Sequence, residues 1–183
     1  MTPEADPGVG VRARARAWPI AALIETDRLQ LEPLRVDHAT ELAAVLDDER
    51  LHEFIGGRPA TTAELRSRYT RLEAGRSPDG SQGWLNWVVR DRGAGVAVGT
   101  VQATLGRNGG LTAEITWVIA AARQGRGYAK EAAAAMVAWL EQQSVRGFVA
   151  HIHPDHAASN RVARHLGLRP TNVMEDGEVR WVR

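Results

Sequence analysis

The sequence predicts a single α/β domain with a mixed, mostly antiparallel sheet of about six or seven strands and about four helices. Three strand-like runs in the middle of the chain are separated only by short turns rich in Gly, Asn and Asp, so they should form an antiparallel meander. The third run is followed by a helix and then another strand, and this crossover makes the two flanking strands parallel. Together these patterns predict the mixed sheet.

Composition narrows the class of protein. The chain has 183 residues, of which 44% are hydrophobic and 25% charged, as in ordinary soluble domains. A net charge of +1 argues against nucleic acid or a membrane surface as partner. The absence of cysteine excludes disulfides, thiolate metal sites and a cysteine nucleophile. No apolar run reaches the roughly 20 residues that span a bilayer, and no secretory signal is evident, so a cytoplasmic protein is expected.

The first part of the chain differs from the rest. Residues 1–22 are rich in Pro, Gly and alternating Arg and Ala, which predicts a flexible tail. The folded domain is therefore expected to span residues 23–183.

The first half of this domain should contain one strand and two helices. Residues 28–34 alternate apolar and polar side chains, as a half-buried strand does. Residues 37–48 place apolar positions on one helical stripe, with Asp37 as the expected N-cap. A second helix should run over residues 62–75, begin at Thr61 or Thr62 and close at its final glycine.

The second half should contain the meander, the crossover and a closing helix–strand unit. Its strands are rich in Val, Ile, Thr and Trp, and its helices are bounded by glycine. The strands are expected at 84–90, 96–105, 111–119, 146–154 and 177–183, and the helices at 128–140 and 156–167.

The stretch Gln124-Gly125-Arg126-Gly127 stands directly before the helix predicted at 128. A helix N-terminus leaves about four backbone N–H groups unpaired and carries about half a unit of positive charge. The two glycines remove side chains, so the N–H groups of residues 125–130 can approach an anion closely. Arg123 and Arg126 add positive charge. The pattern favours an anion-binding site over a simple tight turn.

Two well-known phosphate-binding motifs do not describe this stretch. The sequence contains no GxxxxGK[ST] loop. Lys130 stands where the third glycine of a dinucleotide-binding fingerprint belongs, and the preceding strands are expected to be antiparallel. A nicotinamide cofactor is therefore not expected.

The run Gln124-Gly125-Arg126-Gly127-Tyr128-Ala129 resembles the Q/R-x-x-G-x-G/A motif of the GCN5-related N-acetyltransferase (GNAT) family, which binds the pyrophosphate of acetyl-CoA. The resemblance extends from about residue 24 over nearly the whole chain. It is to the branch that contains the ribosomal-protein alanine acetyltransferases. The stretches that carry it are "IETDRLQLEPLRVDHATELAAVL", "AEITWVIAAARQGRGYAKEA" and "HPDHAASNRVARHLGLRP".

The resemblance implies where acetyl-CoA binds. The strands at 112–119 and 147–153 should form a central parallel pair that splays apart to admit the pantetheine arm. The backbone of Val118 and Ile119 should pair with the pantetheine amides. His156 stands where the family usually has asparagine, beside the cofactor arm. The pyrophosphate should be held by Gln124, Gly125, Arg126, Gly127, Tyr128, Ala129 and Lys130, with Ser159 further along the cofactor.

The chemistry of acetyl transfer needs two proton movements. An amine acceptor must lose a proton before it attacks, and the departing CoA thiolate must gain one. The resemblance makes Ser159 the candidate acid and Glu178 the candidate base. Glu114, inside an otherwise apolar strand, is a second candidate base acting through water. Each also has a structural interpretation: a local helix hydroxyl, a solvated strand-end charge and a strand-face ion pair, respectively.

Two alternatives compete with this interpretation. The string His151-x-His153-x-Asp155-His156 resembles the metal-binding string of the metallo-β-lactamase fold. That fold is longer and needs histidines further downstream, where only His165 remains, so no metal is expected and acetyl-CoA is the expected cofactor. The other alternative is a CoA-binding module without transfer activity, suggested by His156.

The sequence does not identify the amine acceptor. A small-molecule amine and a protein or peptide amine both fit, because no acceptor-specific motif stands in residues 50–87. Dimerisation is common in the family, so a homodimer is also an expectation of the resemblance.

Overall fold

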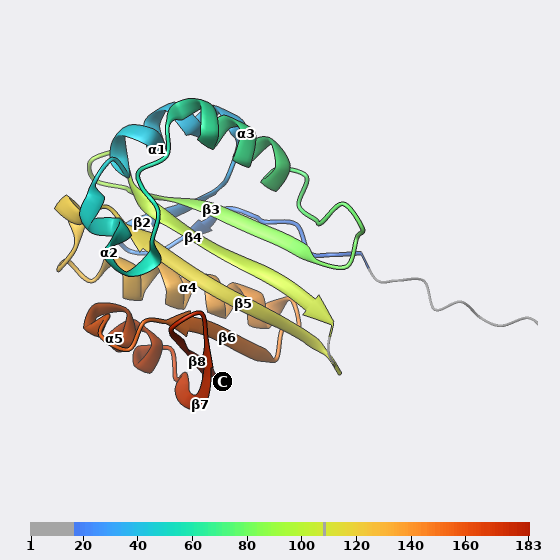
Figure 1. The fold of residues 1–183 in the computed structure, drawn as a ribbon. Helices are drawn as coiled ribbons and strands as arrows, with labels where there is room; N and C mark the ends of the chain where they lie inside the picture. The colour runs from blue at the N-terminus through green and yellow to red at the C-terminus, as the bar shows by residue number, and fades with distance from the viewer. Residues whose placement is uncertain (1–16, 108) are drawn as a thin grey trace, which may run out of the picture.

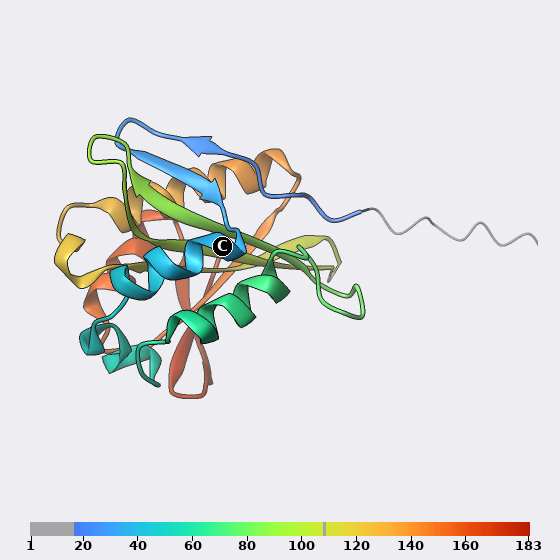
Figure 2. The same cartoon turned by 90° about the horizontal axis from the view of Figure 1, so that it is seen from above.

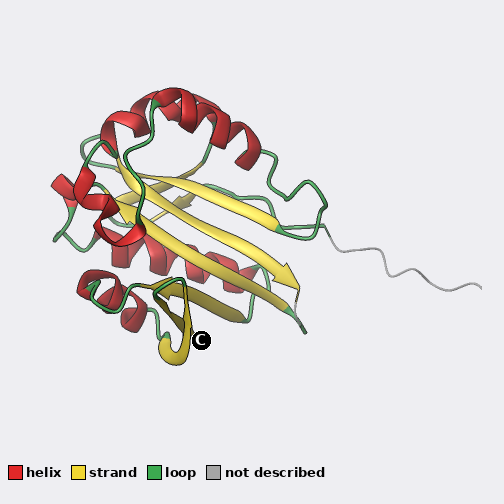
Figure 3. Ribbon diagram, in the orientation of Figure 1, coloured by secondary structure: helices red, strands yellow, loops and turns green. Residues whose placement is uncertain are grey.

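The computed structural model describes residues 17–107 and 109–183. One eight-stranded sheet carries helices on both faces (Figures 1 and 3). The strands are β1 (Ile24–Glu25), β2 (Leu29–Pro33), β3 (Gly83–Asp91), β4 (Val96–Arg107), β5 (Leu111–Ile119), β6 (Gly147–Ile152), β7 (Arg169–Glu175) and β8 (Glu178–Val182). The helices are α1 (Ala39–Val45), α2 (His52–Ile55), α3 (Thr62–Leu72), α4 (Tyr128–Gln142) and α5 (Ala157–His165). Helical turns also occur at Val36–His38, Glu49–Leu51 and Ala121–Arg123.

The sheet is mixed, as the sequence predicts. Its spatial order is β1-β2-β3-β4-β5-β6-β8-β7, and every neighbouring pair is antiparallel except β5 and β6. This parallel pair is short. It runs from Thr112 opposite Gly147 to Glu114 opposite Val149, and no pairing follows beyond. The last part of β5 therefore has no neighbouring strand on its β6 side.

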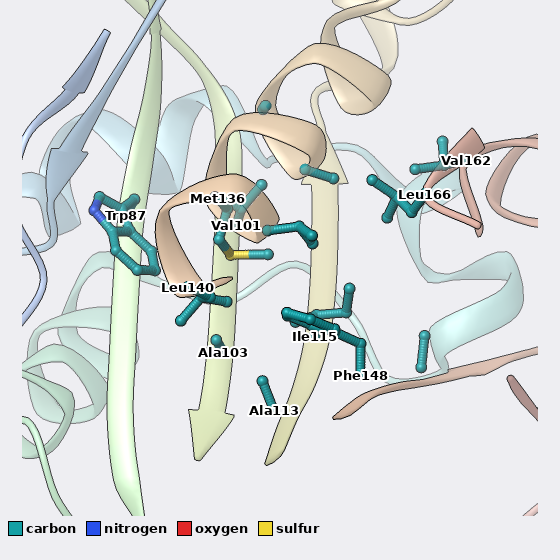
Figure 4. Packing of buried hydrophobic residues seen from close by; sticks show 14 of the residues in the cluster. Trp87, Val101, Ala103, Ala113, Ile115, Met136, Leu140, Phe148, Val162 and Leu166 are labelled. Carbon is teal, nitrogen blue, oxygen red and sulfur yellow. The ribbon is translucent and has the colours of Figure 1, made fainter. Parts of the chain in front are cut away.

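The sheet separates two hydrophobic cores. The larger lies between the sheet and α4 and α5, with Trp87, Ile115, Met136, Leu140 and Phe148 among its buried members (Figure 4). The smaller lies on the opposite face, beneath α1 and α3, which Figure 2 shows lying across the strands. Full burial of a large apolar side chain contributes about 1.5–3 kcal/mol. The cores thus fix α4 to one face and α3 to the other.

The structure has more elements than the sequence predicts. β1 and β7 bring the sheet to eight strands, and α2 is an additional short helix. β7 was missed because nearly all its side chains are exposed, so it shows no alternation. Asp37 is not the N-cap expected for the first helix. The chain instead enters a helical turn at Val36, capped through Arg35 and His38.

Residues 17–22, which the sequence assigns to the tail, contact the domain. The Trp18 indole donates a hydrogen bond to Gly80 O at 3.1 Å. The Trp87 indole donates to Ala22 O at 2.8 Å. Residues 1–16, the remainder of the predicted tail, lie outside the described part of the chain. Among the helices of the described residues, none is long and apolar enough to cross a membrane.

Glu41 ties α1 to the sheet. Both of its carboxylate oxygens accept hydrogen bonds from Arg90, at 2.8 and 3.0 Å, and one also accepts from the Ala97 backbone N–H at 3.0 Å. The Arg90 guanidinium is the main reason that the pKa of Glu41 lies below its ordinary value. The helix is therefore anchored through a carboxylate on its first turn.

Replacing Glu41 by Gln is expected to lower the free energy of unfolding by about 1–2 kcal/mol, once partial solvent exposure is allowed for. Because the folded state lowers this pKa, the wild-type advantage is complete above the ordinary value of 4.5 and fades as the pH falls below it. Urea unfolding of both proteins at pH 7 and pH 3 measures this difference. A gap that stays the same at pH 3 contradicts the assignment.

Candidate active site

The loop before α4 holds its two glycines in a left-handed conformation. Gly125 has φ of 75°, and Gly127, the N-cap of α4, has φ of 82°. Side-chain-bearing residues pay roughly 1–2 kcal/mol to adopt such angles. The conformation therefore explains why the sequence places glycine at both positions.

This backbone presents a run of unpaired N–H donors. Glu131 is the first residue of α4 whose N–H finds a backbone acceptor, Gly127 O at 3.1 Å. In the described part of the chain, the N–H groups of residues 125–130 donate to no protein acceptor. Unpaired N–H groups and the positive end of a helix together form an anion site. The loop thus has the donors that a pyrophosphate requires.

A salt bridge between Arg28 and Glu131 fixes the position of the loop. The Glu131 carboxylate accepts hydrogen bonds from Arg28 Nε at 2.7 Å and from the Thr26 hydroxyl at 2.6 Å. Burial acts to raise the pKa of Glu131, but these hydrogen bonds outweigh it and the pKa is lowered. Arg28 also donates to Arg126 O at 3.0 Å. The start of α4 is therefore bound to the turn between β1 and β2 through Thr26 and Arg28.

Two side chains of the predicted phosphate motif point elsewhere. Gln124 Nε2 donates to Ile119 O at 3.0 Å and so ties the loop to the end of β5. The Tyr128 hydroxyl donates to Asp91 Oδ2 at 2.7 Å, and this bond is the main reason that the pKa of Asp91 is lowered. The Tyr128 side chain is buried, whereas those of Arg126 and Lys130 are exposed. Tyr128 therefore has only its backbone N–H to offer an anion, whereas the Gln124 N–H already donates to Ala121 O at 3.3 Å.

The end of β5 lies next to this loop. Val118 pairs with Thr100 and Ile119 with Gly99, so β4 occupies one edge of β5. Val118 O lies so close to Gly99 of β4 that a Cβ atom at position 99 would collide with it. On the other edge, pairing with β6 has already ended at Glu114. The pairing of Val118 and Ile119 with a pantetheine arm stays a prediction.

Ser159 lies in the first turn of α5 and contacts β5. The Trp117 indole N–H donates a hydrogen bond to Ser159 Oγ at 3.3 Å. Because an indole N–H can only donate, the serine hydroxyl acts as acceptor in this contact. Its own O–H is left to donate to another partner.

His156 is the N-cap residue of α5 and makes no capping hydrogen bond. Its ring stacks on Phe54 of α2, with the centroids 4.4 Å apart and the planes 18° from parallel. Burial lowers the pKa of His156, which favours the neutral ring. Phe54 also contacts His153, at 5.5 Å between centroids. Through these rings α2 is joined to the end of β6 and the start of α5.

The carboxylates predicted as bases occupy one region of the sheet. Glu114 Oε1 lies 3.4 Å from His151 Nδ1, and Glu175 Oε2 lies 3.5 Å from His151 Nε2. Glu114 thus makes a contact on the face of the strand, which is the structural alternative to a role as catalytic base. Glu178 begins β8, opposite Glu175, and is partly buried with no ion pair among the described residues.

The histidine string does not converge. His151 contacts the two carboxylates, whereas His153 lies 4.0 Å from Asp155 and packs on Phe54. Across residues 17–107 and 109–183, no three His, Asp or Glu side chains are grouped closely enough to hold a metal ion.

A cavity of about 180 Å³ lies between α3 and the sheet, on the face of the sheet opposite to α4. Its walls are mainly apolar, with Leu34, Leu65 and Tyr69 among them. Val118 also lines the cavity. The cavity therefore reaches the part of β5 that lies beyond the last residue paired with β6.

Comparison with known sequences decides the family. A sequence model described as the acetyltransferase (GNAT) domain matches residues 28–169, which includes the loop, both strands of the parallel pair and α5. The chain belongs to the GNAT acetyltransferase family. The predicted resemblance is confirmed, and the protein is an acyltransferase of the N-acetyltransferase type.

Solved GNAT structures share the fold. A putative GNAT-family acetyltransferase from Bordetella pertussis is 27% identical, with TM-score 0.68, covering 88% of this chain and 97% of that one. The ribosomal-protein-S5-alanine acetyltransferase from Vibrio fischeri is 17% identical, with TM-score 0.72 and coverages of 88% and 96%. Mycobacterium smegmatis RimJ, solved with a CoA-disulfide, is 18% identical, with TM-score 0.69 and coverages of 85% and 81%. No curated protein matches the sequence.

Sequence reasoning missed three features of this GNAT site. Trp117 was not singled out, because its contact with Ser159 joins residues 42 positions apart. Phe54 was missed because α2 is only four residues long. Arg28, which clamps the loop through Glu131, is separated from it by 103 positions. Arg28 is the first residue of the strand expected at 28–34, but no local pattern in the sequence places the start of that strand beside the glycine loop.

Proposed function

We propose that this GNAT enzyme transfers the acetyl group of acetyl-CoA directly to a primary amine while both substrates are bound. The observation that carries the proposal is the run of unpaired backbone N–H groups at residues 125–130, at the start of α4. When bound, acetyl-CoA supplies an activated acyl group as a thioester. The residues of this chain bind it, orient it and move two protons.

The donor set of the loop fits a pyrophosphate. The backbone N–H groups would hold its oxygens, and the exposed Arg126 and Lys130 add positive charge. The N–H groups are fixed by the Arg28–Glu131 clamp before any ligand arrives. Preorganisation of this kind reduces the entropy lost on binding. The unpaired edge of β5 beyond Glu114 supports the entry of the pantetheine arm beside Val118 and Ile119.

The proton movements are assigned to Ser159 and Glu178. The amine nitrogen forms a bond to the acetyl carbon as the carbon–sulfur bond breaks, so the nitrogen loses a proton and the sulfur gains one. Ser159 is the proposed acid, because its hydroxyl accepts from Trp117 and keeps its own proton to donate. Glu178 is the proposed base, because it is partly buried and has no ion pair among the described residues.

Glu114 is the other proposed base. Its carboxylate already contacts His151, which competes with a role in accepting the amine proton. His156 supports the site differently, because its stacking on Phe54 holds α2 against the start of α5.

Replacing Glu178 by Gln is expected to lower kcat by about a hundred-fold at pH 7, within the usual range for loss of a general base. Acetyl-CoA affinity should stay within two- to three-fold, because Glu178 lies outside the loop. Steady-state CoA release and acetyl-CoA titration measure the two quantities. Glu175→Gln is the matched control, since Glu175 lies opposite Glu178 and is exposed. Equal slowing by both changes, or no slowing by Glu178→Gln at any pH, contradicts the assignment.

An amine panel tests the proposal as a whole. Purified protein is supplied with acetyl-CoA and with amino acids, polyamines, aminoglycosides or peptides, and CoA release is followed. Transfer to at least one amine is expected. Tight acetyl-CoA binding with no transfer to any amine would favour the alternative, a CoA-binding module without catalytic activity.

A further inference from the structure

The cavity beneath α3 continues into a second hollow on the surface. The second hollow, of about 450 Å³, is lined by Arg58, Ala60, Glu64, Ser67, Arg68 and Arg71. Ala60 and Arg68 line the first cavity as well. The two spaces therefore adjoin at these two residues, and together they connect the surface of α3 with Val118 of β5.

The charges of the second hollow do not balance. Glu64 is occupied: it accepts from Arg58 at 2.6 Å and from the Thr61 N–H at 2.8 Å. These contacts, led by Arg58, lower the pKa of Glu64 to about 2, so its carboxylate is paired and ionised. Arg68 and Arg71 have no carboxylate within ion-pair distance among the described residues, although Arg71 donates to the Ser67 hydroxyl at 3.3 Å. Two guanidinium groups thus face the hollow without a counter-charge.

The first cavity lacks negative charge altogether. Its lining contains polar Asn86, Thr100 and Gln102 and the single charged residue Arg68, with no Asp or Glu. A second ammonium group in this space would lie near a guanidinium without any carboxylate to compensate. This argues against a polyamine or a lysine-rich peptide as acceptor.

We propose that the acceptor is an acidic peptide segment whose amino group enters the first cavity and whose carboxylates bind Arg68 and Arg71. The inference rests on the proposed acetyl transfer and names the class of its acceptor. Arg68 and Arg71 are three residues apart on α3, about 4.5 Å along the helix axis. In an extended peptide alternate residues point to the same side and lie about 7 Å apart, a separation that two long, exposed arginine side chains can span. Guanidinium groups are also well suited to bidentate binding of carboxylates.

A peptide is favoured over a single amino acid by the two connected spaces. The first cavity, of about 180 Å³, has room for the amine-bearing residue. Arg71, which has no carboxylate partner among the described residues, lines only the open hollow, so a carboxylate bound there would belong to a later part of the same ligand. The acceptor therefore extends over more than one residue.

Peptides that share an N-terminal residue but carry two acidic, two neutral or two basic residues after it test the inference. The wild-type enzyme is expected to use the acidic peptide with kcat/KM at least ten-fold above that of the basic one, mainly through KM. Higher ionic strength should reduce the difference, because the arginines are exposed. Phosphorylated serine peptides and O-phosphorylated small amines form two further arms, which separate recognition of a peptide from recognition of any anion.

Arg68→Glu should raise KM for the acidic peptide about ten-fold or more, lower it for the basic peptide and change kcat less than two-fold. Arg66→Glu is the matched control. Arg66 is on the same helix, donates to the Thr40 hydroxyl at 3.2 Å and lines neither space. Both positions are exposed, so circular dichroism should show folded protein.

Equal use of the acidic and basic peptides by the wild-type enzyme would overturn the inference. So would equal shifts in KM from Arg68→Glu and Arg66→Glu. If small amines are acetylated but no peptide is, the inference fails while the proposed function stands. If no amine of any kind is acetylated, both fail.

Discussion

Replacing Gly125 and Gly127 together by alanine is expected to weaken acetyl-CoA binding by about a hundred-fold. Each glycine has a positive φ that costs a side-chain-bearing residue roughly 1–2 kcal/mol, and each 1.4 kcal/mol is about ten-fold in affinity. The loop can escape this strain only by leaving the conformation that presents its N–H groups. Calorimetric titration with acetyl-CoA measures the loss.

The matched control is Gly95→Ala. Gly95 lies in the turn between β3 and β4, has φ of 68° and would have open space around a new Cβ atom. The Gly95→Ala substitution therefore introduces backbone strain of the same kind at a position away from the loop. The control should lower thermal stability slightly and leave acetyl-CoA affinity unchanged. An equal loss of affinity in both proteins would mean that the loop change acts through general destabilisation.

Replacing Ser159 by Ala is expected to lower kcat by about a hundred- to a thousand-fold, with acetyl-CoA affinity changed little. General acid catalysis contributes typically 10²–10⁴-fold, and this variant loses the only proposed proton donor to the thiolate. The Trp117 indole would also lose its acceptor, at 3.3 Å in the wild-type protein. Steady-state CoA release, with acetyl-CoA titration in parallel, separates the effect on turnover from an effect on binding.

A double-mutant cycle with Trp117→Phe tests the same assignment. This variant removes the indole N–H that orients the hydroxyl but leaves the hydroxyl itself. It should lower kcat by about ten-fold, less than Ser159→Ala does. Because the tryptophan acts through the serine, the double variant should be no slower than Ser159→Ala alone. Additive losses, or full activity of Ser159→Ala, would contradict the proposed acid.

Local patterns explain why part of the fold could be predicted. The second helix is predicted to begin at Thr61 or Thr62, and in the structure Thr61 is the N-cap and forms a reciprocal capping box with Glu64. The crossover after β5 dictated the single parallel pair. The glycine loop could be predicted because its glycines, its arginines and the start of a helix all lie within a few residues.

The remaining features depend on contacts between distant residues. The carboxylate of Glu41, on the first turn of α1, binds Arg90, which is 49 positions away in the chain. β7 is defined by its pairing with β8 rather than by its own pattern. The cavity beneath α3 arises from packing of that helix on the sheet, so no single stretch of sequence encodes its lining.

The central claim is that the backbone N–H groups of residues 125–130 hold the pyrophosphate of acetyl-CoA. Parallel calorimetric titrations with acetyl-CoA and with S-acetyl-pantetheine, which lacks the pyrophosphate, test it most directly. Acetyl-CoA should bind at one site per chain, and S-acetyl-pantetheine at least about a hundred-fold more weakly, since charge-assisted hydrogen bonds to the loop contribute a few kcal/mol. No binding of acetyl-CoA, or equal affinity for the two compounds, would contradict the account.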